Sequence, residues 1–401
     1  MSAQDTLQDL KDWLERNGGF LHPHVHLNKV DSGFSVVASD DLPTDSKIVS
    51  CPFTLAITKD VALQALSVLL DSPSPLKDLT SWSERQLISV YLSFHWIVGD
   101  GPSSKNVLTH FPYVKSLPAR DKLRTPLHFT EAELELLKGS NLYGATLDRH
   151  REWKAEFEEC RGPISTVDRE WADQLTWELY LTAATHLSSR AFPSTLISQN
   201  LSLTSPGTPE PILLPGVDSL NHARAEPVSW VQSYLGSGPV ADAGSCISLV
   251  LHNHVSAGAE LFNNYGPKPN SELILGYGFS LPNNPDDTIL LKIGGPHGGR
   301  WEVGREARGA DPVWLNVLGA VQEGSEPTYD DHLDAAEALA DMAQQLMDKL
   351  PDVSIPTPGD VREDVALMIR HYIEGQRDIL QSLIEYAGAK EWHGDIPAEE
   401  T

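Results

Sequence analysis

AGAELFNNYGPKPNSELILGYGF, residues 257–279, decides the fold of this chain together with a second stretch, DSLNHARAEP, at 218–227. The first stretch holds Tyr265, followed at fixed distances by Asn270 and Tyr277. A single tyrosine is more often a packed core residue, and an Asn–His pair by itself is common in turns. The spacing of the residues across both stretches is therefore what makes the pattern specific.

Together these stretches resemble the two signature motifs of SET-domain methyltransferases. The spacing from Tyr265 to Phe279 is similar to that of the Rubisco large-subunit methyltransferase branch, which also contains the actin-histidine methyltransferase and several fungal methylases of ribosomal proteins and elongation factors. Three further segments agree in order with that branch: NGGFLHPHVHL at 17–27, GFSVVASDDLP at 33–43 and SSRAF at 188–192.

The resemblance implies an α+β fold, in which a SET-domain β-fold of small sheets contains a helical insertion and is followed by a helical C-terminal domain. It also implies a pseudoknot, an exception to the rule that chain connections do not thread through one another. The predicted domains are the N-terminal part of the SET domain at 1–58, the insertion at 59–187, the C-terminal part with the cofactor and catalytic motifs at 188–282, and a helical, substrate-binding-like domain at 283–401.

Local patterns predict the secondary structure. Helical periodicity predicts an N-terminal helix with one apolar side, formed by Leu7, Leu10, Trp13 and Leu14. Strands and turns are expected at 19–57, and two long helices at 332–350 and 361–387. Ser81 with Glu84, and Thr130 with Glu133, have the spacing of capping boxes at helix N-termini.

The resemblance also implies which residues form the site. Tyr265 matches the catalytic tyrosine, whose hydroxyl lies near the transferring methyl group and orients the incoming nitrogen. Tyr277 matches an aromatic residue that lines the channel for the target side chain and binds substrate. The residues predicted to bind the cofactor, S-adenosyl-L-methionine, are Ser32, Gly33, Phe34, Arg190, Asn221, His222 and Phe279.

These residue types suit the roles that the resemblance gives them. Arg190 has a planar fork that fits the carboxylate of the cofactor. Gly33 lets the backbone approach a ligand closely, because it has no side chain. One position departs from the family, whose opening often reads acidic–Gly–apolar–Gly. Here Ser35 replaces the second glycine, which weakens the cofactor contact or reshapes the loop.

The predicted function is N-methylation of a lysine on a non-histone protein. Methyl transfer from a sulfonium to an amine is an in-line displacement, so alignment and desolvation dominate its rate. Desolvation and the nearby positive charge lower the pKa of the lysine, so a dedicated base is not required. Two alternatives stay open: N-methylation of a protein histidine, and a catalytically weak SET-like module that binds a basic partner.

The charge balance limits the partners. With 56 acidic and 30 basic residues, the net charge of −26 repels phosphate backbones and disfavours direct nucleic-acid binding. It favours a basic protein substrate, although acidity also serves solubility alone. The resemblance implies that a ribosomal protein or a translation factor is one such substrate. The N-terminus does not resemble a signal peptide, and a membrane-spanning apolar run is not expected.

The cysteines and histidines predict neither a disulfide framework nor a metal site. Cys51, Cys160 and Cys246 form no CxxC pair, so a reducing compartment, cytoplasm or nucleus, is expected. His22, His24 and His26 alternate and lie on one face if that segment is extended. We predict structural or surface roles for these histidines, because no cysteine or carboxylate set completes a site.

Overall fold

The computed structural model describes residues 3–30, 33–70, 79–104, 106–198, 209–233, 244–294, 298–322, 324–352, 359 and 361–391. The chain forms two compact units. The first comprises Met1–Leu123 and His150–Gly266, and the second Arg124–Arg149 and Pro267–Thr401. The predicted division into four domains stays a prediction.

The first unit contains two small four-stranded sheets and most of the helices before residue 190. One sheet has the strand order β1-β4-β9-β8 and the other β2-β3-β10-β7. The strands of this unit are β1 (Phe20–Leu21), β2 (Val25–Val30), β3 (Gly33–Ala38), β4 (Ser46–Pro52), β5 (Phe192–Pro193), β6 (Pro211–Ile212), β7 (Asn221–His222), β8 (Val228–Ser233), β9 (Cys246–Leu251) and β10 (Glu260–Asn263), of which β5 and β6 pair only with each other. Its helices are α1 (Ala3–Arg16), α2 (Lys59–Leu69), α3 (Glu84–Val98), α4 (Phe111–Ser116), α7 (Arg169–Gln174) and α8 (Trp177–Arg190), with α6 (Asn141–Val167) shared by both units.

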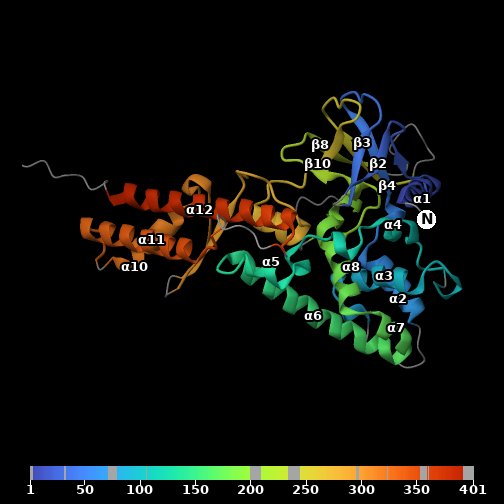
Figure 1. Cartoon of the computed structure of the whole chain (residues 1–401), viewed down its shortest axis with the longest axis horizontal. Helices are drawn as coiled ribbons and strands as arrows, with labels where there is room; N and C mark the ends of the chain where they lie inside the picture. The colour runs from blue at the N-terminus through green and yellow to red at the C-terminus, as the bar shows by residue number, and fades with distance from the viewer. Residues whose placement is uncertain are drawn as a thin grey trace, which may run out of the picture. The chain divides into compact units, whose positions relative to one another are not determined.

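The second unit is mainly helical. Its elements are α5 (Glu131–Glu135), α9 (Asn270–Glu272), the π-helix η8 (Leu273–Tyr277), the hairpin β11 (Thr288–Ile293) and β12 (Gly299–Gly304), and helices α10 (Asp311–Val321), α11 (Tyr329–Lys349) and α12 (Glu363–Glu391). Figure 1 shows α10, α11 and α12 packed side by side. Leu339 and Ile373 are fully buried between them, so apolar burial holds this unit together.

Most of the local predictions are confirmed. The four apolar residues of α1 are buried, and strands β1 to β4 lie within the stretch expected to hold strands and turns. Thr130 and Glu133 make a capping box at α5. The prediction for Ser81 is wrong, because that residue ends a 3-10 helix and Ser83 caps α3 with Gln86. Trp82 is buried immediately before the cap, which sets the start of the helix two residues later than expected.

Two of the three alternating histidines lie outside the strands, so the extended arrangement that would put all three on one face does not form. His22 and His24 lie in the turn before β2 and not on an extended strand, and the backbone N–H of His24 donates to His22 Nδ1 at 3.2 Å. The segment is therefore a turn that its own first histidine stabilises.

Two other histidines, His95 and His110, form a buried network in the first unit. The hydroxyl of Tyr91 donates to His110 Nδ1 at 2.6 Å, and His110 Nε2 donates to the carbonyl of Leu55 at 3.2 Å. His95 Nδ1 donates to the carbonyl of Tyr91 at 2.9 Å, and its Nε2 accepts the backbone N–H of His110 at 3.3 Å. Both rings are thus fully bonded as neutral imidazoles, because each has one nitrogen that donates and one that accepts.

We expect this network to make the first unit less stable in acid. Burial lowers the pKa of His95 to about 4, and burial and the neighbouring His95 lower that of His110 to about 3. Between pH 6.5 and these values only the unfolded chain takes up the protons, so each ring is expected to remove about 1.4 kcal/mol of unfolding free energy per pH unit. Urea unfolding between pH 7 and pH 5 measures this slope. His95→Asn is expected to reduce it, and equal slopes in the variant and the wild type would contradict the assignment.

Candidate functional site

The pairing of β7 with β10 brings the two motif stretches together. These strands run parallel, with Asn221 opposite Phe262 and His222 opposite Asn263. On its other side β10 pairs with β3, so that Leu261 lies opposite Val36. Residues 33–34, 221–222 and 260–265, which are far apart in the sequence, therefore belong to one small sheet and the turn that follows it (Figure 1).

Tyr265 is fixed by contacts with the other motif stretch. Its backbone N–H donates to His222 Nδ1 at 3.0 Å, and its ring stacks on that imidazole with centroids 5.1 Å apart. Its hydroxyl donates to the carbonyl of Leu220 at 2.8 Å. Because its proton goes to this carbonyl, the phenol oxygen presents lone pairs to anything else that approaches. The side chain is half-buried and keeps some access to solvent.

Asn221 links three strands of the same sheet. Its side-chain nitrogen donates to the carbonyl of Phe34 at 3.2 Å and to Glu260 Oε1 at 2.7 Å. The amide is exposed, and its oxygen accepts no hydrogen bond from the residues that the structure describes. Asn221 therefore holds β3 against β10 and leaves one acceptor for a ligand.

Arg190, the last residue of α8, lies beside the same stretch. Its Nη1 donates to the backbone oxygen of Asp218 at 2.9 Å and forms an ion pair with Asp218 Oδ2 at 3.5 Å. Burial opposes the charge of Arg190, but the charge of Asp218 and the neighbouring phenols outweigh it and raise the pKa of the guanidinium. In its hydrogen bonds to the described residues, Arg190 donates only through Nη1. Its Nε and Nη2 can therefore donate to a ligand.

The structure brings together only part of the predicted site. Gly33 begins β3 and Phe34 follows it. Phe34 also lines a cavity of about 360 Å³ with Thr6, Val30 and residues 115–119, 121 and 122. Ser32 lies outside the described residues. Ser35, where the family has glycine, is buried in regular β-structure opposite Asn28, which places the departure within a strand and not in a loop.

Tyr277 and Phe279 belong to the second unit. Tyr277 ends the π-helix η8, and its ring meets that of Phe279 edge to face, with centroids 6.2 Å apart. The ammonium of Lys268 lies 5.7 Å from the centre of the Tyr277 ring and pairs with Glu272. Burial raises the pKa of Tyr277, although Lys268 opposes the shift, so the phenol stays protonated at neutral pH.

Sequence reasoning missed two residues that contact this site. Glu260 accepts from Asn221, and Tyr113 of α4 donates to Asp218 Oδ2 at 2.6 Å. Glu260 stands within the quoted stretch, but its strand position does not reveal a polar partner. Tyr113 lies among apolar residues in FPYVKS, a segment with the pattern of an ordinary core helix. The described residues contain no group of histidines, cysteines or carboxylates arranged to hold a metal ion.

Loss of the Asn221 side chain tests its place in this arrangement. Asn221→Ala removes the bonds to Phe34 and Glu260 and the free amide oxygen. We expect the affinity for S-adenosylmethionine to fall about tenfold or more, since each polar contact of this kind contributes roughly 1 kcal/mol. Calorimetry measures the affinity, and Asn28→Ala, on strand β2 at the other edge of the sheet, serves as the control. Unchanged affinity would show that Asn221 has no role in binding.

Comparison with known proteins identifies relatives, although no family model matches the chain. The chain is 33% identical to the ribosomal lysine N-methyltransferase set10 of Schizosaccharomyces pombe, over 69% of this chain and 46% of that protein. It is 24% identical to the protein-lysine N-methyltransferase EFM1 of Saccharomyces cerevisiae, over 73% of this chain and 53% of that protein. The chain thus spans about half the length of the curated relatives that it matches.

A solved structure shares the fold. The SET domain of LSMT bound to lysine and AdoHcy superposes with a TM-score of 0.73, at 17% identity, over 98% of this chain and 92% of that one. This confirms the predicted fold class: small sheets of the SET type with a helical C-terminal region. The chain therefore has the SET-domain fold of LSMT, and its sequence is similar to that of protein-lysine N-methyltransferases.

Proposed function

We propose that this protein transfers a methyl group from S-adenosyl-L-methionine to a lysine side chain of another protein. The observation that carries the proposal is the parallel pairing of β7 with β10, which sets the phenol of Tyr265 against the carbonyl of Leu220 and the ring of His222. The names of the relatives, set10 and EFM1 among them, support lysine as the target.

The donor set fits the cofactor. The free edge of Arg190 suits a carboxylate, and the free amide oxygen of Asn221 suits a donor such as an amine or a hydroxyl group. Gly33 at the start of β3 offers backbone without a side chain. We propose that these residues, with Ser32, Phe34, His222 and Phe279, hold S-adenosyl-L-methionine, which supplies an activated methyl group on its sulfonium.

The residues of the chain would align and desolvate the nucleophile. The hydroxyl of Tyr265 and the carbonyl of Leu220 are two oxygens 2.8 Å apart, and both present lone pairs. Such a pair attracts the N–H groups of an amine and the positive charge next to the methyl group. In this proposal Tyr265 orients the incoming nitrogen, and Tyr277 lines the channel for the substrate side chain.

A second candidate is methylation of a protein histidine. It is supported by the human actin-histidine N-methyltransferase, which is 23% identical over 73% of this chain and 45% of that protein. A third is a binding module without turnover, which Ser35 in place of the family glycine favours.

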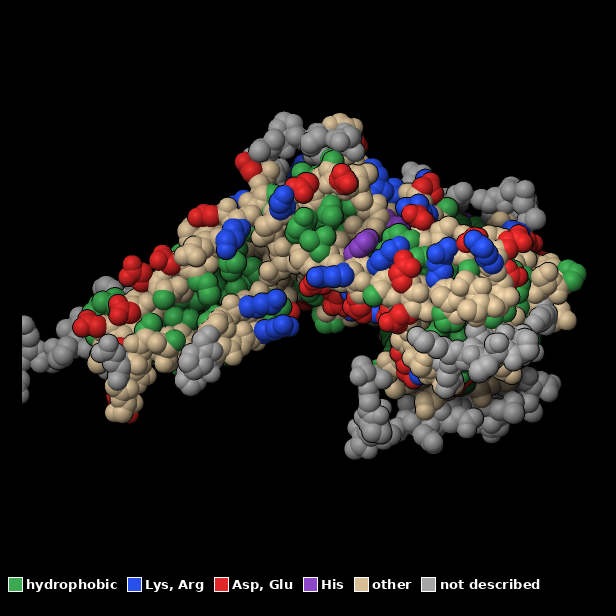
Figure 2. Space-filling model, turned by 90° about the horizontal axis from the view of Figure 1, so that it is seen from below, with side chains coloured by type: hydrophobic (Ala, Val, Ile, Leu, Met, Phe, Trp, Pro, Cys, Tyr) green, Lys and Arg blue, Asp and Glu red, His purple; other side chains and the backbone are tan. Residues whose placement is uncertain are grey.

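The substrate of the proposed reaction is a basic protein, and a ribosomal protein or translation factor suits this description. The net charge of −26 would draw in such a partner. Helix α11 alone carries Asp330, Asp334, Glu337, Asp341 and Asp348, and on the face drawn in Figure 2 acidic side chains are interspersed with basic ones. No described helix is both long and apolar enough to cross a membrane.

We also place the reaction in the cytoplasm or nucleus. The three cysteines are free thiols, and Cys51 and Cys160 are buried. Thiols without disulfide partners are typical of a reducing compartment. Fluorescence microscopy of the tagged protein at its natural level tests this assignment, and a secreted or membrane-bound pool would contradict it.

Two measurements test the function. Calorimetry with S-adenosylmethionine is expected to show one site, and absence of binding by folded protein would support the binding-module alternative. Incubation with labelled cofactor and a protein extract from methylase-deficient cells is then expected to label a basic protein. Mass spectrometry of the modified residue decides the target: methyl-lysine supports the proposal, and methyl-histidine supports the second candidate.

A further inference from the structure

Tyr113 reaches the candidate cofactor site from a part of the chain without any motif. It lies in α4, and its side chain is almost fully buried. Its hydroxyl donates to Asp218 Oδ2 at 2.6 Å, across a separation of 105 residues. The same oxygen forms the ion pair with Arg190 Nη1 at 3.5 Å. One carboxylate oxygen is therefore shared between a phenol and the arginine predicted to bind the cofactor.

Stability alone does not explain why the Asp218–Arg190 ion pair is buried. The Asp218 side chain is fully buried and that of Arg190 is 18% exposed, so both charged groups have lost most of their water. Burying an ion pair is often no more favourable than filling the same space with apolar side chains. Such a pair is better explained by a need to hold a charged group in one position.

The charges of the three groups depend on one another. Burial raises the pKa of Asp218, while Arg190 and the Tyr113 hydroxyl oppose the shift. Burial and the charge of Asp218 raise the pKa of Tyr113 well above its ordinary value. Tyr113 therefore stays protonated and acts as a permanent donor to the carboxylate.

The geometry leaves one edge of the arginine for a ligand. Asp218 takes Nη1 twice, through its backbone oxygen at 2.9 Å and through Oδ2. A carboxylate that is free to turn would instead bind two guanidinium nitrogens, which is the preferred geometry of an arginine–carboxylate pair. The hydrogen bond from Tyr113 fixes the carboxylate and so prevents this two-nitrogen contact.

We propose that Tyr113 is a positioning residue that, through Asp218, keeps the Nε and Nη2 edge of Arg190 available for the carboxylate of S-adenosylmethionine. The inference rests on the proposed function. It gives the helical segment that contains α4 a part in binding the cofactor, although the hydroxyl of Tyr113 donates to Asp218 and not to a predicted site residue.

The experiment compares two ligands that differ only in the carboxylate. Calorimetry measures the dissociation constants of S-adenosylmethionine and decarboxylated S-adenosylmethionine for the full chain and for Tyr113→Phe. The variant is expected to bind S-adenosylmethionine about tenfold more weakly, the loss of roughly one hydrogen bond to a charged group. Its affinity for the decarboxylated ligand is expected to stay within about twofold of wild type, because the inference acts only through the carboxylate.

Tyr91→Phe is the matched control. It also removes a buried hydroxyl from the first unit, where the hydroxyl of Tyr91 donates to His110 at 2.6 Å and not to Asp218. Neither dissociation constant should change in this variant. The ratio of the two constants is measured on the same folded protein, so a loss of stability alone does not alter it.

Three results would overturn the inference. Equal weakening of both ligands by Tyr113→Phe would make Tyr113 a structural residue of the site. Unchanged affinity for both would show that Arg190 keeps its position without the phenol. Failure of the wild-type protein to bind S-adenosylmethionine would remove the proposed function itself, and the inference with it.

Discussion

Tyr265→Phe is expected to lower kcat about 100-fold or more, while the dissociation constant of S-adenosylmethionine stays within about threefold of wild type. The substitution removes only the hydroxyl that donates to the carbonyl of Leu220 at 2.8 Å. The stacking on His222 and the backbone bond to its Nδ1 at 3.0 Å do not need that hydroxyl. The ring should therefore keep its place, and the cofactor its site.

The reason for the large effect on kcat is that the oxygen acts at the reacting centre. An incoming amine that loses an acceptor for its N–H groups spends less time in line with the methyl group, and alignment is the main source of rate in such a displacement. Single-turnover kinetics with the identified substrate measures the chemical step, and calorimetry measures the affinity for the cofactor.

Tyr180→Phe is a suitable control for Tyr265→Phe. The hydroxyl of Tyr180 donates to Glu156 at 3.2 Å in the helical part of the first unit. This variant should keep both kcat and the cofactor affinity. If Tyr265→Phe left kcat unchanged, the tyrosine would not orient the nucleophile. If it reduced kcat and affinity in parallel, the hydroxyl would hold the site together and have no separate role in transfer.

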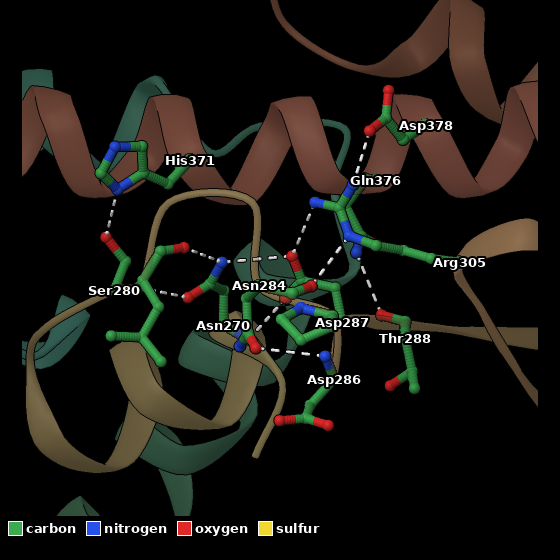
Figure 3. Close-up of polar contacts among 12 residues, drawn as sticks. Asn270, Ser280, Asn284, Asp286, Asp287, Thr288, Arg305, His371, Gln376 and Asp378 are labelled. Atoms are coloured by element: carbon green, nitrogen blue, oxygen red, sulfur yellow. Dashed lines mark hydrogen bonds and ion pairs between the residues drawn. The ribbon is translucent and has the colours of Figure 1, made fainter. Parts of the chain in front are cut away.

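The second large effect is expected from Asp287 in the second unit (Figure 3). Its Oδ1 accepts the backbone N–H of Asn270 at 2.7 Å. Its Oδ2 accepts from the side chain of Asn270 at 3.2 Å and from Arg305 Nη2 at 3.3 Å. The carboxylate also lies against α12 so closely that a Cβ atom on Gly375 would come within 2.4 Å of Oδ2. Asp287 thus joins the start of α9 to Arg305, which follows the hairpin, and to α12.

Asp287→Ala is expected to reduce the unfolding free energy of the second unit by about 3–5 kcal/mol, because it removes the buried carboxylate on which the backbone N–H of Asn270, its side-chain amide and Arg305 converge. Asp378 provides the matched comparison, since it pairs with the same arginine at 2.5 Å. The side chain of Asp287 is 1% exposed and that of Asp378 67% exposed. Asp378→Asn should therefore cost less than about 1 kcal/mol.

Urea unfolding of the full chain, followed by the fluorescence of Trp301 and Trp314 in the second unit and of the other tryptophans, measures both variants. Similar losses of unfolding free energy for Asp287→Ala and Asp378→Asn would mean that solvent screens both carboxylates alike. That result would contradict the expectation drawn from the different exposure of the two side chains. No loss in either would mean that the network contributes nothing to stability.

The contacts of Asp287 also explain why the motif needs Asn270. Its side chain accepts the N–H of Leu281 at 2.8 Å and donates to the carbonyl of the same residue at 2.9 Å. Asn270 is fully buried, so it serves as a brace for the loop at 278–287. The sequence marks the position of this residue within the motif, but only the structure gives it a structural role.

The sequence by itself determined the fold family, the apolar face of α1 and the cap of α5. Each of these follows from residues that are close together in the sequence or from a motif of fixed spacing, so the sequence alone holds the information that predicts it. The N-terminus of α3 shows the limit of local information. Both Ser81 and Ser83 have a plausible partner three residues on, and the burial of Trp82 between them accompanies the start at Glu84.

Only the tertiary structure decided which residues meet at the site. Asn221 reaches Phe34 across 187 residues, and Tyr113 reaches Asp218 across 105. The pairing of β7 with β10 is made by very short strands, which carry too few residues for an alternating pattern to predict a partner. A hydrogen bond depends on direction and distance in space, and the sequence near Tyr113 has only the pattern of a core helix. Its contact with Asp218 arises when both segments pack into the same core.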